Sequence, residues 1–181
     1  MQIDADGELL NVTPERSSVT ISSSGHDILV KHAVTPTDWL PLGMCVDTAK
    51  AWLFYITKHN VTREQLTISF KLLHKGLTTR SSANTGQWLT AIEFENDIRQ
   101  VHIGTQDEEW FARYAEQNWM PKRLIAALDK EGLVITTVED DGLETKLPEL
   151  LVGEQFYLHY ILADSPRRKS TEYPDDWDVS T

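Results

Sequence analysis

The stretch "QFYLHYILA", residues 155–163, decides our prediction of the fold. In an extended chain successive side chains point to opposite faces, so this stretch presents two sets of side chains. Both sets are apolar or aromatic, with Phe156, Leu158, Tyr160 and Leu162 in one and Tyr157, His159, Ile161 and Ala163 in the other. Such a strand is typical of the middle of a sheet that is covered on both faces. We therefore expect residues 155–163 to form a central strand.

Other strand-like segments precede this one along the chain. Residues 17–34 predict two short strands, and residues 87–104 predict a hairpin with a bulge near Arg99. Residues 133–140 predict a further strand, and residues 143–154, which contain a proline, read as a connection. Most of the chain is thus expected to be antiparallel sheet.

Two segments fit either a strand or a helix. Residues 50–57 mix apolar, aromatic and β-branched side chains, and the choice stays open there. In residues 65–73, apolar and polar side chains alternate, which is typical of a half-buried strand. Thr62 and Gln65 could instead form a helix capping box, but the alternation favours the strand.

Two helices are predicted in the second half of the chain. For residues 105–118, Thr105 is the expected N-cap and Glu108 completes a capping box. For residues 121–131, a proline stands at the first helical position. The predicted fold class is therefore α+β, with a mainly antiparallel sheet and both helices packed on it.

The same pattern predicts the domain organisation. We expect a loose N-terminal leader over residues 1–16 and a single globular domain over residues 17–164. Residues 165–181 are expected to be a flexible or weakly docking tail.

Charge and composition narrow the range of functions. The 181 residues include 28 acidic and 17 basic side chains, for a net charge of −11, which disfavours nucleic acids and anionic membranes as partners. No signal peptide or membrane-spanning run is evident, and Cys45 is the only cysteine, so we expect a cytoplasmic protein. Neither a metal site nor a cofactor is predicted.

No local motif of catalysis is present. The glycines form no phosphate-binding loop, and neither a GxSxG nor an HExxH motif occurs. We therefore name no catalytic residue, and the sequence favours a protein that is not an enzyme.

Clusters of carboxylates lead to the first hypothesis of function. An acidic surface with aromatic side chains is suited to steering and holding a basic protein. The candidate residues are Asp107, Glu108, Glu109, Asp140, Asp141, Asp175, Asp176 and Trp177. The hypothesis is a non-enzymatic protein-binding module, with an inhibitor or a toxin-neutralising immunity-type protein as a concrete example.

The alternative hypothesis is a small-molecule-binding or catalytic α+β domain. Its pocket would lie near His159 on the predicted central strand, with Tyr157 and Trp88 as further candidates. A homo-oligomer held by an edge strand and Trp177 is a third possibility.

Overall fold

The structure is a computed structural model. It describes residues 2–5, 8–11, 18–22, 25–35, 46–61, 66–72, 76–82, 89–117, 120–124 and 135–167. The strands are β1 (Gln2–Ala5), β2 (Glu8–Asn11), β3 (Ser18–Ser22), β4 (His26–Thr35), β5 (Thr48–Lys58), β6 (Thr67–Lys71), β7 (Thr78–Ser82), β8 (Leu89–Glu95), β9 (Arg99–Gln106), β10 (Thr136–Glu139), β11 (Gly142–Lys146) and β12 (Gln155–Pro166). The helical elements are the α-helix α1 (Glu108–Glu116) and the 3-10 turn η1 (Lys122–Leu124).

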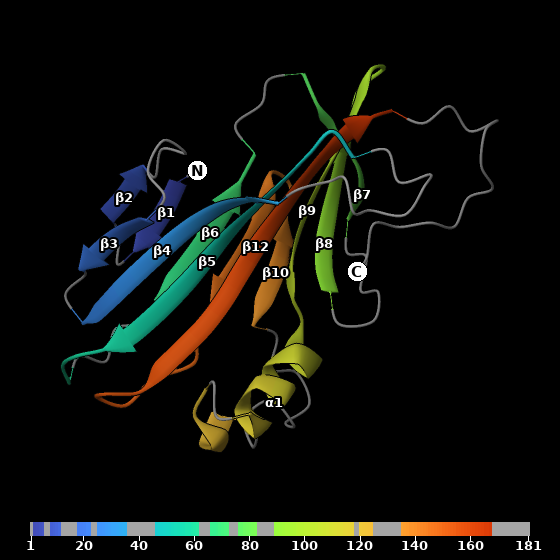
Figure 1. Ribbon diagram of the computed structural model, residues 1–181. Coiled ribbons are helices and arrows are strands. Elements are labelled where there is room, and N and C mark those ends of the chain that lie inside the picture. The colour runs from blue at the N-terminus through green and yellow to red at the C-terminus, as the bar shows by residue number, and fades with distance from the viewer. Residues whose placement is uncertain are drawn as a thin grey trace.

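A seven-stranded antiparallel sheet forms the main layer of the described chain. Its strand order is β3-β4-β5-β12-β9-β8-β7, so β12 lies in the centre with β5 and β9 as its hydrogen-bonded neighbours. Figure 1 shows these long strands crossing the molecule side by side. The prediction that residues 155–163 form a central strand is confirmed.

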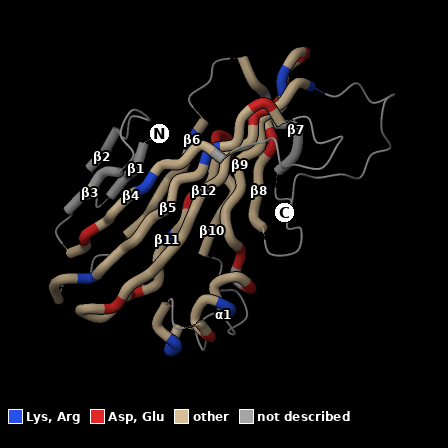
Figure 2. Tube along the Cα trace, viewed as in Figure 1, with Lys and Arg blue, Asp and Glu red and all other residues tan. Residues whose placement is uncertain are grey.

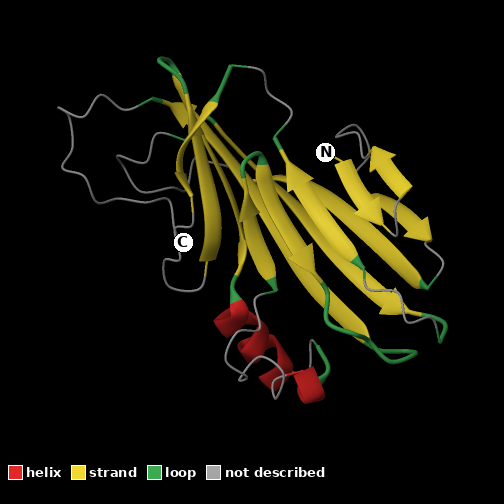
Figure 3. Cartoon of the chain, turned by 180° about the vertical axis from the view of Figure 1, so that it is seen from behind, coloured by secondary structure: helices red, strands yellow, loops and turns green. Residues whose placement is uncertain are grey.

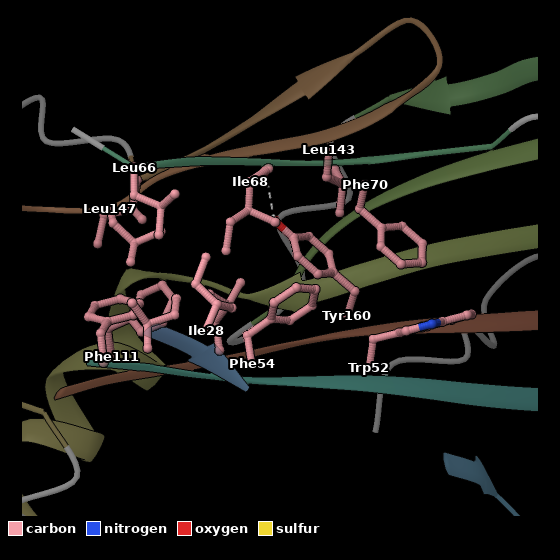
Figure 4. Close-up of a cluster of buried hydrophobic side chains, with 14 of the residues drawn as sticks. Ile28, Trp52, Phe54, Leu66, Ile68, Phe70, Phe111, Leu143, Leu147 and Tyr160 are labelled. Atoms are coloured by element: carbon pink, nitrogen blue, oxygen red, sulfur yellow. Dashed lines mark hydrogen bonds between the residues drawn. The ribbon is translucent and has the colours of Figure 1, made fainter. Parts of the chain in front are cut away.

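A smaller sheet of order β10-β11-β6 packs against one face of the main sheet. Between the two layers lies a core in which Phe70 of β6 stacks on Tyr160 of β12, with ring centroids 4.8 Å apart. Figure 4 shows the side chains of Leu66, Ile68 and Phe70 meeting those of the main sheet. β6 and β12 therefore each contribute one set of alternating side chains to the core, which the period-2 pattern requires.

The two ambiguous segments are both strands. In β6, Ile68 and Phe70 are buried while Thr67, Ser69 and Lys71 are half-buried, so the strand prediction for residues 65–73 is confirmed. Residues 50–57 belong to β5, whose buried side chains alternate in the same way. In a helix, apolar side chains at alternating positions would not share one face, and part of them would be exposed to solvent.

One of the two predicted helices is confirmed. α1 covers Glu108–Glu116, but its N-cap is Asp107, whose side chain accepts a hydrogen bond from the backbone N–H of Trp110. Thr105, the expected cap, is buried within β9. Within residues 121–131 the structure describes residues 121–124, where η1 makes a single 3-10 turn, so a second α-helix is not confirmed. Figure 3 shows the helical elements at one end of the sheets.

Several local predictions are wrong. Residues 142–146 form β11, which pairs with both β10 and β6, where the sequence predicts a connection. Leu143 and Thr145 are buried there, and this alternation is too short to predict a strand by itself. The β8–β9 register is regular, so no bulge lies near Arg99. Ile98 suggested one, but it belongs to the turn and is 75% exposed.

Strands also lie near both ends of the described chain. Residues 1–16, predicted to be a loose leader, include the paired strands β1 and β2, and β1 lies beside β6. At the other end, β12 continues to Pro166, past the predicted boundary at residue 164.

Within the part of the chain that the structure describes, no helix has the length and apolar character needed to cross a membrane.

Candidate functional site

The outer face of the main sheet points away from the smaller sheet. It is more exposed than the sequence of the central strand predicts. On the core side of β12, Phe156 and Tyr160 are fully buried. On the outer side, Tyr157 and His159 are half-buried and Ile161 is 37% exposed. The expectation that both faces of this strand are covered is therefore wrong, and an apolar, aromatic surface remains accessible.

A hollow of about 380 Å³ lies on this outer face. It is formed by neighbouring strands β5 and β12, by the end of β9 and by α1. Its outward side chains are Leu53, Tyr55, Gln106, Tyr114, Tyr157 and His159. Tyr55 and Tyr157 meet edge to face with ring centroids 5.1 Å apart. The described side chains that line the hollow carry no full charge, but the ammonium of Lys31 lies 4.9 Å from the centroid of the Tyr55 ring, so a positive charge lies beside this aromatic wall.

Gln106 is the buried polar side chain at the floor of the hollow. It is only 2% exposed and lies at the end of β9, next to β12. Its Oε1 accepts a 2.9 Å hydrogen bond from the backbone N–H of His159. Its Nε2 donates to the Tyr114 hydroxyl at 3.0 Å and lies 2.5 Å from His159 Nδ1. A buried amide must satisfy both of its ends, and this arrangement does so.

These contacts determine which nitrogen of His159 carries the proton. The backbone N–H of His159 can only donate, so the oxygen of Gln106 must face it and the amide nitrogen must face Nδ1. The amide nitrogen has only donors, so Nδ1 accepts. A neutral imidazole with an accepting Nδ1 carries its proton on Nε2. His159 therefore presents Nε2–H as a hydrogen-bond donor.

The electrostatics of the hollow agree with a neutral imidazole. Burial lowers the pKa of His159 to about 4, because the charged form loses its hydration there. At neutral pH the ring is then uncharged, and it lines the hollow together with Tyr55, Tyr114 and Tyr157.

The placement of α1 follows from its sequence. Asp107 caps the helix, and Phe111 on its buried face packs against Phe156, with ring centroids 5.1 Å apart. Tyr114 stands three residues later, close to Phe111 on the helix surface, and so reaches the edge of the hollow. The helix prediction thus bears on the site, although sequence reasoning did not assign Tyr114 to it.

Of the three predicted pocket residues, the structure brings two together. Tyr157 and His159 both line the hollow, whereas Trp88 lies outside the described residues. Sequence reasoning missed Leu53, Tyr55 and Gln106. A strand over residues 50–57 places Leu53 and Tyr55 on one face, but the sequence of that segment fits a helix equally well. Gln106 carries no sequence pattern that distinguishes it from a surface glutamine.

The predicted acidic residues do not form one site in the described chain. Asp107 caps α1, and Glu109 is exposed on the same helix. Asp140 and Asp141 are exposed at the β10–β11 turn, where Asp141 forms a 3.1 Å ion pair with Lys71. Figure 2 shows acidic residues at both ends of the sheets, interspersed with basic ones.

The remaining predicted positions lie beyond what the structure describes. Asp175, Asp176 and Trp177 are outside the described residues, and so is the side chain of Glu108. Among the described residues, no three His, Cys, Asp or Glu side chains are grouped as metal ligands.

Comparisons with known proteins add no assignment. The chain matches no protein-family model, no curated protein and no solved structure.

Proposed function

We propose that this protein is a small-molecule-binding module and that the hollow over β5 and β12 is its ligand site. The observation that carries the proposal is the pairing of Gln106 with His159, which holds a neutral Nε2–H donor in an aromatic wall. The proposed ligand is uncharged, with a flat apolar part and one hydrogen-bond acceptor such as a carbonyl oxygen.

The properties of the hollow support this ligand class. A volume of about 380 Å³ lies in the range of ligand sites, and apolar walls with few polar groups are typical of them. The described lining side chains offer no counter-charge to an anion or a cation, and the Lys31 ammonium beside them already lies over the Tyr55 ring. A neutral acceptor can use the His159 N–H while its apolar part covers the tyrosine rings.

The test is a fragment screen by nuclear magnetic resonance. Neutral aromatic amides and ethers, beginning with benzamide, would be added to ¹⁵N-labelled protein. We expect the signals of His159 and Gln106 to show chemical-shift changes that saturate at the lowest ligand concentration. These changes should be lost in His159→Ala. Ile161→Ala is the matched control, because Ile161 lies on the same face of β12 but outside the lining of the hollow. Shifts that survive His159→Ala, or a screen without any hit, would refute the proposal.

A basic protein partner is the second candidate function. The net charge of −11 and the exposed carboxylates of Glu109, Asp140 and Asp141 favour it. An inhibitor or immunity-type role in the cytoplasm is its specific form. Affinity capture at low and high salt separates the two candidates, because an electrostatic complex weakens with salt. Reversing the charge of Asp140 and Asp141 should abolish such capture, whereas His159→Ala should leave it unchanged.

A further inference from the structure

A second group of chemically distinctive side chains lies on the core-facing side of β4 and β5. His32 and Trp52 are cross-strand partners, and their ring centroids are 5.0 Å apart. Their neighbours in β5, Leu53 and Tyr55, point to the opposite face and line the hollow. Figure 4 shows Trp52 at the far end of the drawn cluster from Phe111, and hence from α1. This group is separate from the hollow.

Two ring nitrogens in this group are buried without a hydrogen-bond partner among the described residues. They are Trp52 Nε1 and His32 Nε2. Trp52 as a whole is only 6% exposed, so water has little access to its indole. The indole nitrogen can only donate, and a buried donor without an acceptor is costly and uncommon. Two such nitrogens on paired residues therefore indicate a place for an acceptor.

Lys50 supplies a positive charge on the same face of the sheet. Lys50 is on the same face of β5 as Trp52, one alternation away, and its charge reinforces burial in lowering the pKa of His32. Within the described part of the chain, Lys50 forms no ion pair, although the protein has 28 acidic residues. Its cross-strand partner Val34 is 63% exposed, so the surface beside Lys50 is accessible to solvent.

An apolar wall adjoins the nitrogen atoms. Phe70 of β6 contacts Trp52 edge to face, with ring centroids 4.9 Å apart. The arrangement thus combines the indole N–H of Trp52, an imidazole nitrogen of His32 that can carry a proton, one ammonium group and an aromatic surface. A carboxylate fits it, because its two oxygens can accept from two donors at once while the ammonium balances the charge.

We propose that His32, Lys50 and Trp52 form a binding site for a carboxylate ligand with an apolar body. One carboxylate oxygen accepts from Trp52 Nε1–H and the other from His32 Nε2–H. Lys50 supplies the opposite charge, and the apolar body of the ligand lies toward Phe70. The site is independent of the hollow and of the function proposed for it.

The experiment follows the indole N–H signal of Trp52 in ¹H–¹⁵N spectra of the full chain, assigned with Trp52→Phe. Acetate, benzoate and inorganic phosphate are titrated separately at constant ionic strength, with sodium chloride as the reference. We expect a saturating downfield shift with both carboxylates and tighter binding of benzoate, because only benzoate has an aromatic body. Signals of His159 and Gln106 should not move.

The matched variants are Lys50→Gln and Lys31→Gln, which remove the same charge from paired neighbouring strands. Lys31 is exposed and belongs to the other face of β4. We expect Lys50→Gln to weaken benzoate binding about fivefold and Lys31→Gln to leave it unchanged. Three results would overturn the proposal: no saturating shift with carboxylates, tighter binding of phosphate than of benzoate, or equal affinity in wild type and Lys50→Gln. A well-dispersed spectrum of each variant would show that it is folded.

Discussion

The hydroxyl of Tyr160 on β12 lies 2.5 Å from Thr145 Oγ1 on β11, so a buried hydrogen bond joins the two layers of the core. The same hydroxyl lies 3.2 Å from the backbone carbonyl oxygen of Ile68, and Thr145 also contacts Thr136 Oγ1 at 2.9 Å. Tyr160 is fully buried, and this burial raises the pKa of its hydroxyl well above the ordinary value. Its polar end is therefore held in the neutral, hydrogen-bonded form.

Removing this hydroxyl should destabilise the fold. We expect Tyr160→Phe to lower the free energy of unfolding by about 1–2 kcal/mol, since a buried hydrogen bond is lost and Thr145 keeps only part of its partners. Urea denaturation measures the change. Tyr157→Phe is the control, because the Tyr157 hydroxyl bonds Gln155 near the surface, and its loss should cost less than about 0.5 kcal/mol. Equal effects of the two substitutions would show that the inter-layer bond contributes nothing.

The contact of β11 with β6 should tolerate no side chain at Gly142. A Cβ atom there would lie 2.0 Å from the Phe70 backbone oxygen, which cannot move without breaking the smaller sheet. We expect Gly142→Ala to destabilise the protein by more than about 2 kcal/mol, the scale of overpacking in a rigid place. At Gly104, the nearest atom to a new Cβ belongs to the Leu89 side chain, at 3.1 Å, and it can rotate away.

Gly104→Ala is therefore the matched control for Gly142→Ala, with an expected loss of less than about 1 kcal/mol. Both variants would be compared with wild type by thermal and urea unfolding. Wild-type stability in Gly142→Ala would mean that β11 and β6 are not packed as closely as described.

The sequence predicts strands well wherever alternation is long and clean. Residues 65–73 and 155–163 show this, because their apolar side chains must face one core. Strand prediction fails where a short pattern becomes a strand only through the strand that it pairs with. Residues 142–146 form a strand by pairing with β6, which lies far away in the sequence. The hollow was predictable only in part for the same reason. His159 and Tyr157 lie on one strand, whereas Gln106 reaches them through the pairing of β9 with β12.

Gln106 should control the proton position of His159. In Gln106→Leu, the backbone N–H of His159 loses its acceptor and Nδ1 loses its donor, so the free energy of unfolding should fall by about 1–3 kcal/mol. The imidazole should also lose its preference for Nε2–H, which ¹⁵N chemical shifts of the ring report. Gln100→Leu tests a glutamine on the same strand, whose amide contacts Glu93 and not a histidine. An unchanged Nε2–H preference in Gln106→Leu would contradict our assignment.

The low pKa of His159 predicts how stability depends on pH. In the unfolded chain the ring binds a proton below its ordinary pKa of 6.5, whereas in the folded protein it does so only below about 4. Between these values the unfolded state holds more protons, so stability falls as the pH is lowered from 6.5 to 4. The loss from this single group should be about 3 kcal/mol, and it should stop growing below the folded pKa.

Because carboxylates titrate in part of the same range, the measurement is a comparison of wild type with His159→Gln, which has no titrating group at this position. The difference in unfolding free energy between the two should change by that amount across the range. A constant difference, or an imidazole of His159 that titrates near 6.5 in the folded protein, would mean that the hollow does not exclude water from the ring.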